Sequence, residues 1–176
     1  MPELDHLWAG WRSSYLDAVT AADAAGGSEA GRGRASGVSL FEGILALEDA
    51  EGFVVHRGER CATLLNAYPY TSGHLLVLPN RAVAELDQLD EATYDQLWRE
   101  VRAAVAALRA AYHCDGVNVG MNLGRAAGAG VPDHLHVHAL PRWIADGNFM
   151  TAAALTRVMP ETLDTTWSKL RAAWPT

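Results

Sequence analysis

The sequence predicts an α+β fold in which helices pack against one antiparallel sheet of about five strands. Three observations lead to this prediction. Short apolar runs bounded by turn residues predict strands, and two longer segments place apolar residues at three- and four-residue steps, as helices do. Most connections between these segments are short, which favours antiparallel pairing because a parallel crossover needs a dozen or more residues.

The strands are predicted from apolar runs on either side of turn residues. Two runs flank Gly58, and a third follows a Tyr-Pro turn, so three strands are expected in succession. Two further strands are separated by a glycine-rich loop. The five predicted strands cover residues 53–57, 61–65, 73–78, 116–122 and 134–140.

Two helices are predicted within the same domain. Residues 90–112 repeat apolar side chains at helical spacing behind Asp90, a residue type that caps helix starts. A C-terminal helix is expected behind Pro160, since proline is favoured in a first helical turn. Residues 38–176 are therefore predicted to form a single domain.

The N-terminal segment differs from this domain. Residues 1–20 carry an apolar stripe at helical spacing and are predicted to form a helical arm. Residues 21–37 are rich in Ala, Gly and Ser without an apolar period, so burial would not offset their ordering entropy. We expect a flexible linker there.

Composition excludes several classes of protein. With 49% hydrophobic and 20% charged residues, the 176-residue chain has the balance of one compact domain. A formal charge of -7 argues against a broad surface for nucleic acid or an anionic membrane. The longest uncharged stretch, residues 61–80, contains Pro69 and Gly73 and is therefore not predicted to span a membrane. The first residues lack the basic flank and apolar stretch of a signal peptide. We expect a soluble, cytoplasmic protein, and the low cysteine content fits a reducing compartment.

Three histidines at alternate positions, His134, His136 and His138, are the most informative feature of the chain. In a strand, alternate side chains point to the same face. The three imidazoles would therefore share one face, while Leu135 and Val137 enter the core.

The preceding strand supplies a matching polar face. Asn118, Gly120 and Asn122 alternate with apolar residues, so small and amide side chains would lie beside the histidines. The glycines of the following loop, among them Gly128 and Gly130, allow backbone N–H groups to cradle an anion. Phosphate is the natural candidate.

The alternation alone leaves three interpretations open. Three imidazoles suit a catalytic zinc ion, buried histidines can be satisfied by backbone carbonyls, and one imidazole can attack phosphorus while the others orient it and supply a proton. Other nucleotide chemistry is excluded more firmly. Lys169 is the only lysine, so there is no Walker phosphate loop, and no Gly-x-Ser-x-Gly elbow occurs.

The segment His134–Leu140 resembles the signature of the histidine-triad (HIT) superfamily, whose members are nucleotide hydrolases and transferases that act through a covalent nucleotidyl-histidine. Residues 65–79 look like the family's earlier strand pair, and Asn122-Leu123-Gly124 precedes the triad at the usual distance. The resemblance covers residues 41–143. It implies a HIT-like nucleotide-binding domain with no obligatory metal at the histidines.

Matching positions imply the roles of individual residues. His136 would be the nucleophile that attacks the α-phosphorus, His138 would contact the phosphate or the leaving oxygen, and His134 would support them. The resemblance also implies a substrate-binding set: Asn66 at the ribose, His74 in support, Asn122 at the phosphate, Gly128, Ala129 and Gly130 in the phosphate loop, Phe41 and Ile44 against the base, and Trp143 after the last strand.

Some of these residues also have structural interpretations. Phe41 and Ile44 can be plain core, Asn66 can cap a turn, and His74 can be buried for structural reasons.

Within the superfamily the sequence is most similar to the branch of mycobacterial-type diadenosine tetraphosphate phosphorylases. Shared features include Leu7-Trp8, the segment 118–124, and Pro141-Arg142-Trp143 followed by Asn148-Phe149.

The chain departs from relatives at two places. Where these phosphorylases have Gly-Ser in the phosphate loop, this chain has Ala129-Gly130 and lacks the hydroxyl, which leaves the acceptor open. Many relatives carry Cys-x-x-Cys where this chain has Ser39-Leu40-Phe41-Glu42, so we expect no structural zinc.

The expected function is cleavage of dinucleoside polyphosphates, above all phosphorolysis of diadenosine tetraphosphate, through a nucleotidyl-His136 intermediate. Three alternatives remain. The first is hydrolysis of dinucleoside polyphosphates or nucleoside phosphoramidates, the second is a metallohydrolase, and the third is a catalytically weak nucleotide-binding or interaction protein. A small nucleotide is the expected partner, a divalent cation can accompany its polyphosphate, and nucleic acid and membranes are not expected to bind. The resemblance further implies a homodimer joined through the helix at 90–112 and a strand edge.

Overall fold

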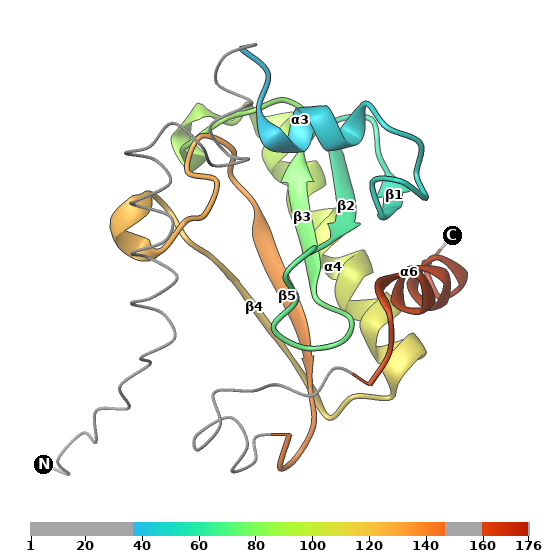
Figure 1. Cartoon of the computed structure of the whole chain (residues 1–176). Coiled ribbons are helices and arrows are strands. Elements are labelled where there is room, and N and C mark those ends of the chain that lie inside the picture. Colours follow the sequence, from blue (N-terminus) through green and yellow to red (C-terminus); the bar gives the residue numbers. More distant parts are fainter. Residues whose placement is uncertain (1–36, 147–159, 176) are drawn as a thin grey trace, which may run out of the picture. The chain divides into compact units, whose positions relative to one another are not determined.

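The structure is a computed structural model that describes residues 37–146 and 160–175 (Figure 1). The arm predicted at 1–20, nearly all of the linker at 21–37, and Asn148-Phe149 lie outside the described residues. The described elements are α3 (Leu40–Leu45), β1 (Val54–Arg57), β2 (Cys61–Leu65), β3 (Leu75–Pro79), the 3-10 helix η2 (Leu86–Gln88), α4 (Glu91–Tyr112), β4 (Gly116–Met121), the 3-10 helix η3 (Arg125–Ala127), β5 (Val137–Arg142) and α6 (Leu163–Ala172).

Five strands form one antiparallel sheet in the order β1-β2-β3-β5-β4 (Figure 1). The predicted fold class is therefore confirmed. The last strand in sequence, β5, lies between β3 and β4, so His138 pairs with Leu76 on one side and with Gly120 on the other. This register puts the predicted small-residue face of β4 directly beside the histidine strand.

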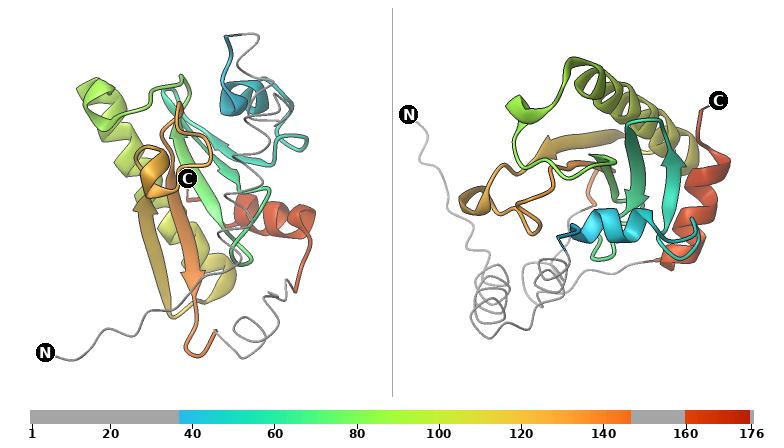
Figure 2. Two further views of the ribbon diagram at one scale, coloured as in Figure 1. Left: turned by 60° about the vertical axis from the view of Figure 1, so that its left-hand side comes forward. Right: turned by 90° about the horizontal axis from the view of Figure 1, so that it is seen from above.

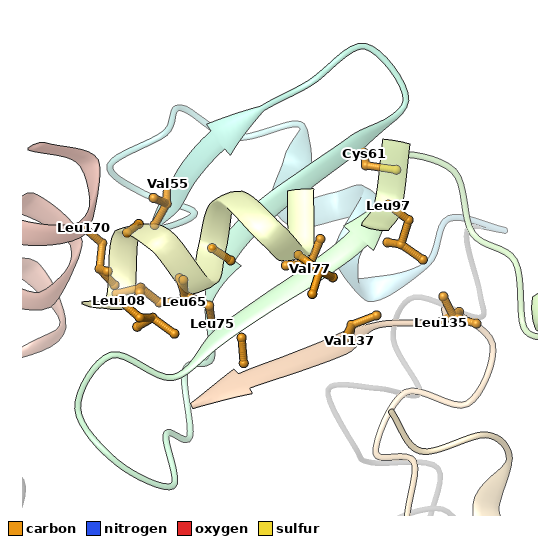
Figure 3. Close-up of a cluster of buried hydrophobic side chains, with 14 residues drawn as sticks. Val55, Cys61, Leu65, Leu75, Val77, Leu97, Leu108, Leu135, Val137 and Leu170 are labelled. Atoms are coloured by element: carbon orange, nitrogen blue, oxygen red, sulfur yellow. The ribbon is translucent and has the colours of Figure 1, made fainter. Parts of the chain in front are cut away.

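Helix α4 covers one face of the sheet (Figure 2). The Asp90 side chain accepts a hydrogen bond from the amide of Thr93 at 2.8 Å, which caps the helix start as predicted. Buried side chains of α4, including Leu97 and Leu108, meet Val77 and other apolar residues of the sheet (Figure 3). This face is a continuous apolar core.

Helix α6 begins behind a Thr162 N-cap and packs beside β1 and α4. Leu170 enters the core on the α4 side, and the Trp167 indole donates to the Val54 carbonyl at 2.9 Å. Arg171 adds an ion pair to Asp49 at 2.6 Å.

Helix α3 lies on the opposite face of the sheet from α4 (Figure 2), and the sequence analysis did not predict it. Ser39 and Glu42 form a capping box, because each side chain accepts a hydrogen bond from the other residue's amide. The buried Phe41 ring packs with Leu64, Leu76 and their neighbours in a second, smaller apolar cluster.

The last strand begins later than predicted. It starts at Val137 rather than His134, because the amide of Leu135 donates to the Val83 carbonyl at 2.7 Å instead of joining the ladder with β3. The predicted bounds of β1, β2, β3 and β4 differ from the observed ones by two residues at most. None of the helices in the described part of the chain is long and apolar enough to cross a membrane.

Position 73 requires a glycine. Its φ is +83°, and a Cβ atom there would lie 2.8 Å from Cε2 of Tyr112. The residue stands between the α4 core and His74, so it joins the packed face of the sheet to the histidine face.

Candidate active site

The three histidines lie on the sheet face that α3 covers, while Leu135 and Val137 enter the core on the α4 side. The rings of His136 and His138 are 5.0 Å apart between centroids. The predicted division of this segment into an imidazole face and a core face is therefore present, although the first two histidines precede the strand.

His136 has a fixed protonation pattern. Its Nδ1 lies 2.8 Å from the backbone carbonyl oxygen of His134. A carbonyl only accepts hydrogen bonds, so Nδ1 carries the hydrogen and neutral His136 has a lone pair on Nε2. The ring is 6% exposed, and burial lowers its pKa, which keeps it neutral near pH 7.

His138 has the opposite pattern, set by a chain of two hydrogen bonds. The amide of Tyr70 donates to Nδ1 of His74 at 3.1 Å, so neutral His74 carries its hydrogen on Nε2. That Nε2 lies 2.9 Å from Nδ1 of His138 and donates to it. Neutral His138 therefore carries its own hydrogen on Nε2.

This Nε2–H group is available to a ligand. The atom is buried and has no hydrogen-bond partner within the described residues. Burial first, and then the nearby His136, lower the pKa of His138 to about 4. Two neighbouring rings thus present a lone pair and a hydrogen-bond donor on one face, which is the combination that nucleophilic attack with a supporting proton donor needs.

His134 is fully buried, and both of its ring nitrogens are occupied. Nε2 lies 2.8 Å from the Pro79 carbonyl oxygen, and Nδ1 lies 2.7 Å from Oγ of Ser39. Burial is the main cause that lowers its pKa. The ring is therefore a neutral support beneath the other two histidines.

The histidines do not converge on a common metal position. Both nitrogens of His134 and the Nδ1 atoms of His136 and His138 are engaged with other groups, which leaves two ring nitrogens. A catalytic zinc site takes three protein ligands. Among the described residues, no group of three His, Cys, Asp or Glu side chains is placed to hold a metal ion.

The structure brings several predicted substrate-binding residues to this face. Phe41 meets the rings of His134 and His136 edge-on, at centroid distances of 5.3 and 5.1 Å. Ile44 packs against the same apolar cluster. The Asn66 side chain accepts from the Tyr68 amide at 3.0 Å and lies 3.3 Å from His74, so it caps the turn that carries His74.

The loop between β4 and β5 is held by its own hydrogen bonds. The amides of residues 127–129 donate to the carbonyls of Gly124 and Arg125, and Asn122 donates to the Gly128 carbonyl at 3.4 Å. These amides stabilise the turn, and none of these bonds uses the amide of Gly130. The predicted phosphate-binding role of Gly128, Ala129 and Gly130 stays a prediction.

Trp143 lies elsewhere. Its ring meets the Tyr112 ring edge-on at 6.1 Å, beyond the end of β5, and it has no ring contact with the triad. Its assignment to the substrate site stays a prediction.

Three residues of the site were missed by the sequence analysis. Ser39 and Glu42 fit the Ser-x-x-Glu pattern of a capping box, which was a usable signal for the helix start. The Tyr70 ring lies stacked near His138, 6.0 Å away at an interplanar angle of 17°. No sequence pattern pointed to it.

Comparison with known proteins identifies the class. The family model described as the HIT domain matches residues 48–143. The chain belongs to this family. Its predicted membership is therefore confirmed.

Particular relatives agree with the class. An AP-4-A phosphorylase of Mycobacterium tuberculosis strain H37Rv is 37% identical over 173 residues, which cover 98% of this chain and 85% of the relative. A bis(5'-nucleosyl)-tetraphosphatase (asymmetrical) of Schizosaccharomyces pombe is 36% identical over 93 residues, which cover 53% of this chain and 50% of the relative.

Among solved structures, a zinc-bound histidine triad family protein from Mycobacterium smegmatis has a TM-score of 0.61 and 25% identity, covering 76% of this chain and 91% of that one.

Proposed function

We propose that this chain is an enzyme that cleaves dinucleoside polyphosphates by nucleotidyl transfer through His136. The observation that carries the proposal is the opposite protonation of two neighbouring Nε2 atoms, a lone pair on His136 and an N–H on His138. The names of the M. tuberculosis and S. pombe relatives support the substrate class.

In the first step, the lone pair on Nε2 of His136 forms a bond to the α-phosphorus. The bond from phosphorus to the bridging oxygen breaks, and its electron pair leaves with the second nucleotide. His138 Nε2–H donates to that oxygen. The hydrogen bond from Nδ1 of His136 to the His134 carbonyl stabilises the positive charge that develops on the ring.

In the second step, an acceptor oxygen attacks phosphorus, the N–P bond breaks, and its electron pair returns to Nε2 of His136. Phosphate as acceptor would convert diadenosine tetraphosphate to ATP and ADP, whereas water would give ATP and AMP. We propose phosphate as the acceptor, with no cofactor at the histidines and a divalent cation accompanying the polyphosphate. Hydrolysis is the second candidate, because Ala129-Gly130 supplies no hydroxyl to hold the acceptor phosphate.

The remaining predicted residues complete the substrate site in this proposal. Phe41 and Ile44 lie under the base, Asn66 contacts the ribose beside His74, and Asn122 with the loop at Gly128, Ala129 and Gly130 contacts the phosphates. Trp143, whose ring meets Tyr112 beyond the end of β5, is proposed as a further substrate contact.

Product analysis tests the proposal. The purified protein is incubated with diadenosine tetraphosphate, with and without inorganic phosphate, and the nucleotides are separated and identified. ATP with ADP supports phosphorolysis, and ATP with AMP supports hydrolysis. If neither dinucleoside polyphosphates nor nucleoside phosphoramidates yield products, the chain is a nucleotide-binding protein and the proposal is wrong.

The proposed assembly is a homodimer in the cytoplasm. Within the described residues, β4 is paired only with β5 and leaves one edge open. Exposed Val119 on this strand and exposed Tyr94 and Trp98 on α4 offer apolar surface for a second copy. Light scattering of the purified protein measures whether the mass is that of two chains.

A further inference from the structure

The most buried histidine of the triad cannot act on a substrate directly. His134 has no exposed surface, and its two ring nitrogens bind Pro79 and Ser39. Its function must therefore pass through the groups that it contacts.

The hydrogen atoms of this contact can be assigned. The Pro79 carbonyl only accepts, so neutral His134 carries its hydrogen on Nε2 and has a lone pair on Nδ1. The Ser39 hydroxyl then donates to Nδ1 across 2.7 Å, and it accepts from the Glu42 amide at 3.1 Å. One hydroxyl thus joins the start of α3 to the triad.

The Glu42 carboxylate joins two segments of main chain. One oxygen accepts from the Ser39 amide at 2.9 Å, and the other accepts from the Ala82 amide at 3.0 Å. These backbone hydrogen bonds, that of Ala82 first, hold the pKa of Glu42 below its usual range. The segment of Ala82 also holds the triad main chain, because the Val83 carbonyl accepts from the Leu135 amide.

We propose that Ser39, Glu42 and His134 form a hydrogen-bonded clasp that positions the nucleophile His136 without a metal ion. His136 depends on this clasp because its Nδ1–H donates to the His134 carbonyl. The inference rests on the proposed role of His136 and adds two positioning residues, Ser39 and Glu42, that touch no reacting atom.

A zinc ion does not fit this donor set. Relatives with Cys-x-x-Cys would place two thiols where this chain has Ser39 and Glu42, and zinc is held by thiolate sulfur and imidazole nitrogen. Here both carboxylate oxygens accept backbone N–H groups, and both nitrogens of His134 are engaged. The clasp therefore takes the part of a structural metal with hydrogen bonds alone.

Three substitutions at one position separate a helix cap from a clasp. Ser39→Ala removes both the acceptor for the Glu42 amide and the donor to His134. Ser39→Asp keeps a cap acceptor, but an ionised carboxylate cannot donate, so it favours a proton on His134 Nδ1. Ser39→Thr keeps the hydroxyl. Asp90→Ala is the matched control, since it removes the N-cap of α4, and the interactions of the Asp90 carboxylate go to Thr93 and Arg60 rather than to the clasp.

The readouts are the histidine ring ¹⁵N NMR spectrum, kcat and KM with diadenosine tetraphosphate, the melting temperature, and metal content by mass spectrometry. We expect the metal-free wild-type protein to show a lone pair on His134 Nδ1. Ser39→Ala should shift the His136 ring signals and lower kcat roughly tenfold to a hundredfold with little change in KM. Ser39→Asp should protonate both nitrogens of His134, and Ser39→Thr should restore the wild-type spectrum.

Three results would overturn the clasp. The first is that Ser39→Ala lowers the melting temperature, as Asp90→Ala is expected to do, but leaves the His136 signals and kcat unchanged. The second is that Ser39→Asp leaves the His134 spectrum as it is in the wild type. The third is that the purified wild-type protein contains one equivalent of zinc and that removing this zinc with a chelator alters the His134 signals. If the wild type cleaves no nucleotide, the proposed function fails while the NMR spectra still decide the clasp.

Discussion

The two faces of the sheet fix their side chains in different ways. On the α4 face, Leu97, Leu108 and Val137 are held by close packing among apolar neighbours. On the α3 face, the His134 and His136 rings are held by hydrogen bonds to main-chain carbonyls. Packing fixes a volume and tolerates similar shapes, whereas a hydrogen bond also fixes which nitrogen carries the hydrogen. The larger core on the first face therefore contributes more to stability, and the hydrogen-bonded rings on the second face determine the chemistry.

The largest effect is expected on the histidine face. His136→Ala removes the nucleophile and should lower kcat by at least about 10⁴-fold while the protein stays folded. His113→Asn is the control, because His113 is exposed and its left-handed backbone (φ 47°) suits Asn. Turnover assays and circular dichroism measure both variants. Substantial turnover by His136→Ala would rule out a covalent mechanism through His136.

The reverse outcome is expected on the packed face. Leu108→Ala creates a cavity at a fully buried position and should lower the free energy of unfolding by about 2–5 kcal/mol. The kcat of the folded protein should stay close to that of the wild type, because Leu108 lies in the core on the α4 side of the sheet. Urea unfolding and turnover at low temperature check this. A drop in kcat without a loss of stability would contradict the division between the faces.

A substitution at a residue that links the two faces should lower both stability and kcat. Gly73→Ala forces a side chain into a left-handed conformation against the Tyr112 ring and should cost about 1–3 kcal/mol of stability. It should also lower kcat, because His74 is the next residue. Gly116→Ala is the matched control, since a Cβ there meets no atom within 4 Å. Equal stability of the two variants would contradict this interpretation.

The smallest effect is a pH dependence that belongs to the histidine face. His138 has its pKa lowered by burial from 6.5 to about 4, so the unfolded chain binds a proton between these values that the folded chain does not. Its contribution to stability is complete above pH 6.5 and is lost as the pH falls toward about 4. His138→Asn should flatten this slope in urea unfolding, and Leu108→Ala should not. An unchanged slope in His138→Asn would refute the assignment.

The sequence was sufficient where local pattern decides structure. The apolar period from Leu97 to Leu108 and the Asp90 cap predicted α4 to within one residue. Helix α3 has six residues, too few for a period to show, and only its Ser39-x-x-Glu42 cap marks it. The start of β5 depends on a long-range bond from Leu135, which no local pattern encodes.

The candidate site was likewise predictable only where it depends on local pattern. Alternation correctly put the histidines on one face, because side-chain direction in an extended chain is a local property. Their protonation depends on the Pro79 and His134 carbonyls and the Tyr70 amide. These are main-chain groups that every sequence contains, so residue types alone do not reveal them.

The reliance of His138 on the Tyr70 amide bears on mutational robustness. Nineteen of the twenty amino acids supply a backbone N–H, and proline alone does not. Saturation mutagenesis at position 70 should therefore single out proline as the replacement that removes this main-chain donor to Nδ1 of His74 and leaves the Asn66 side-chain amide, 3.3 Å from the same nitrogen, as the remaining donor. Every other replacement keeps this N–H, although it loses the Tyr70 ring that lies stacked near His138.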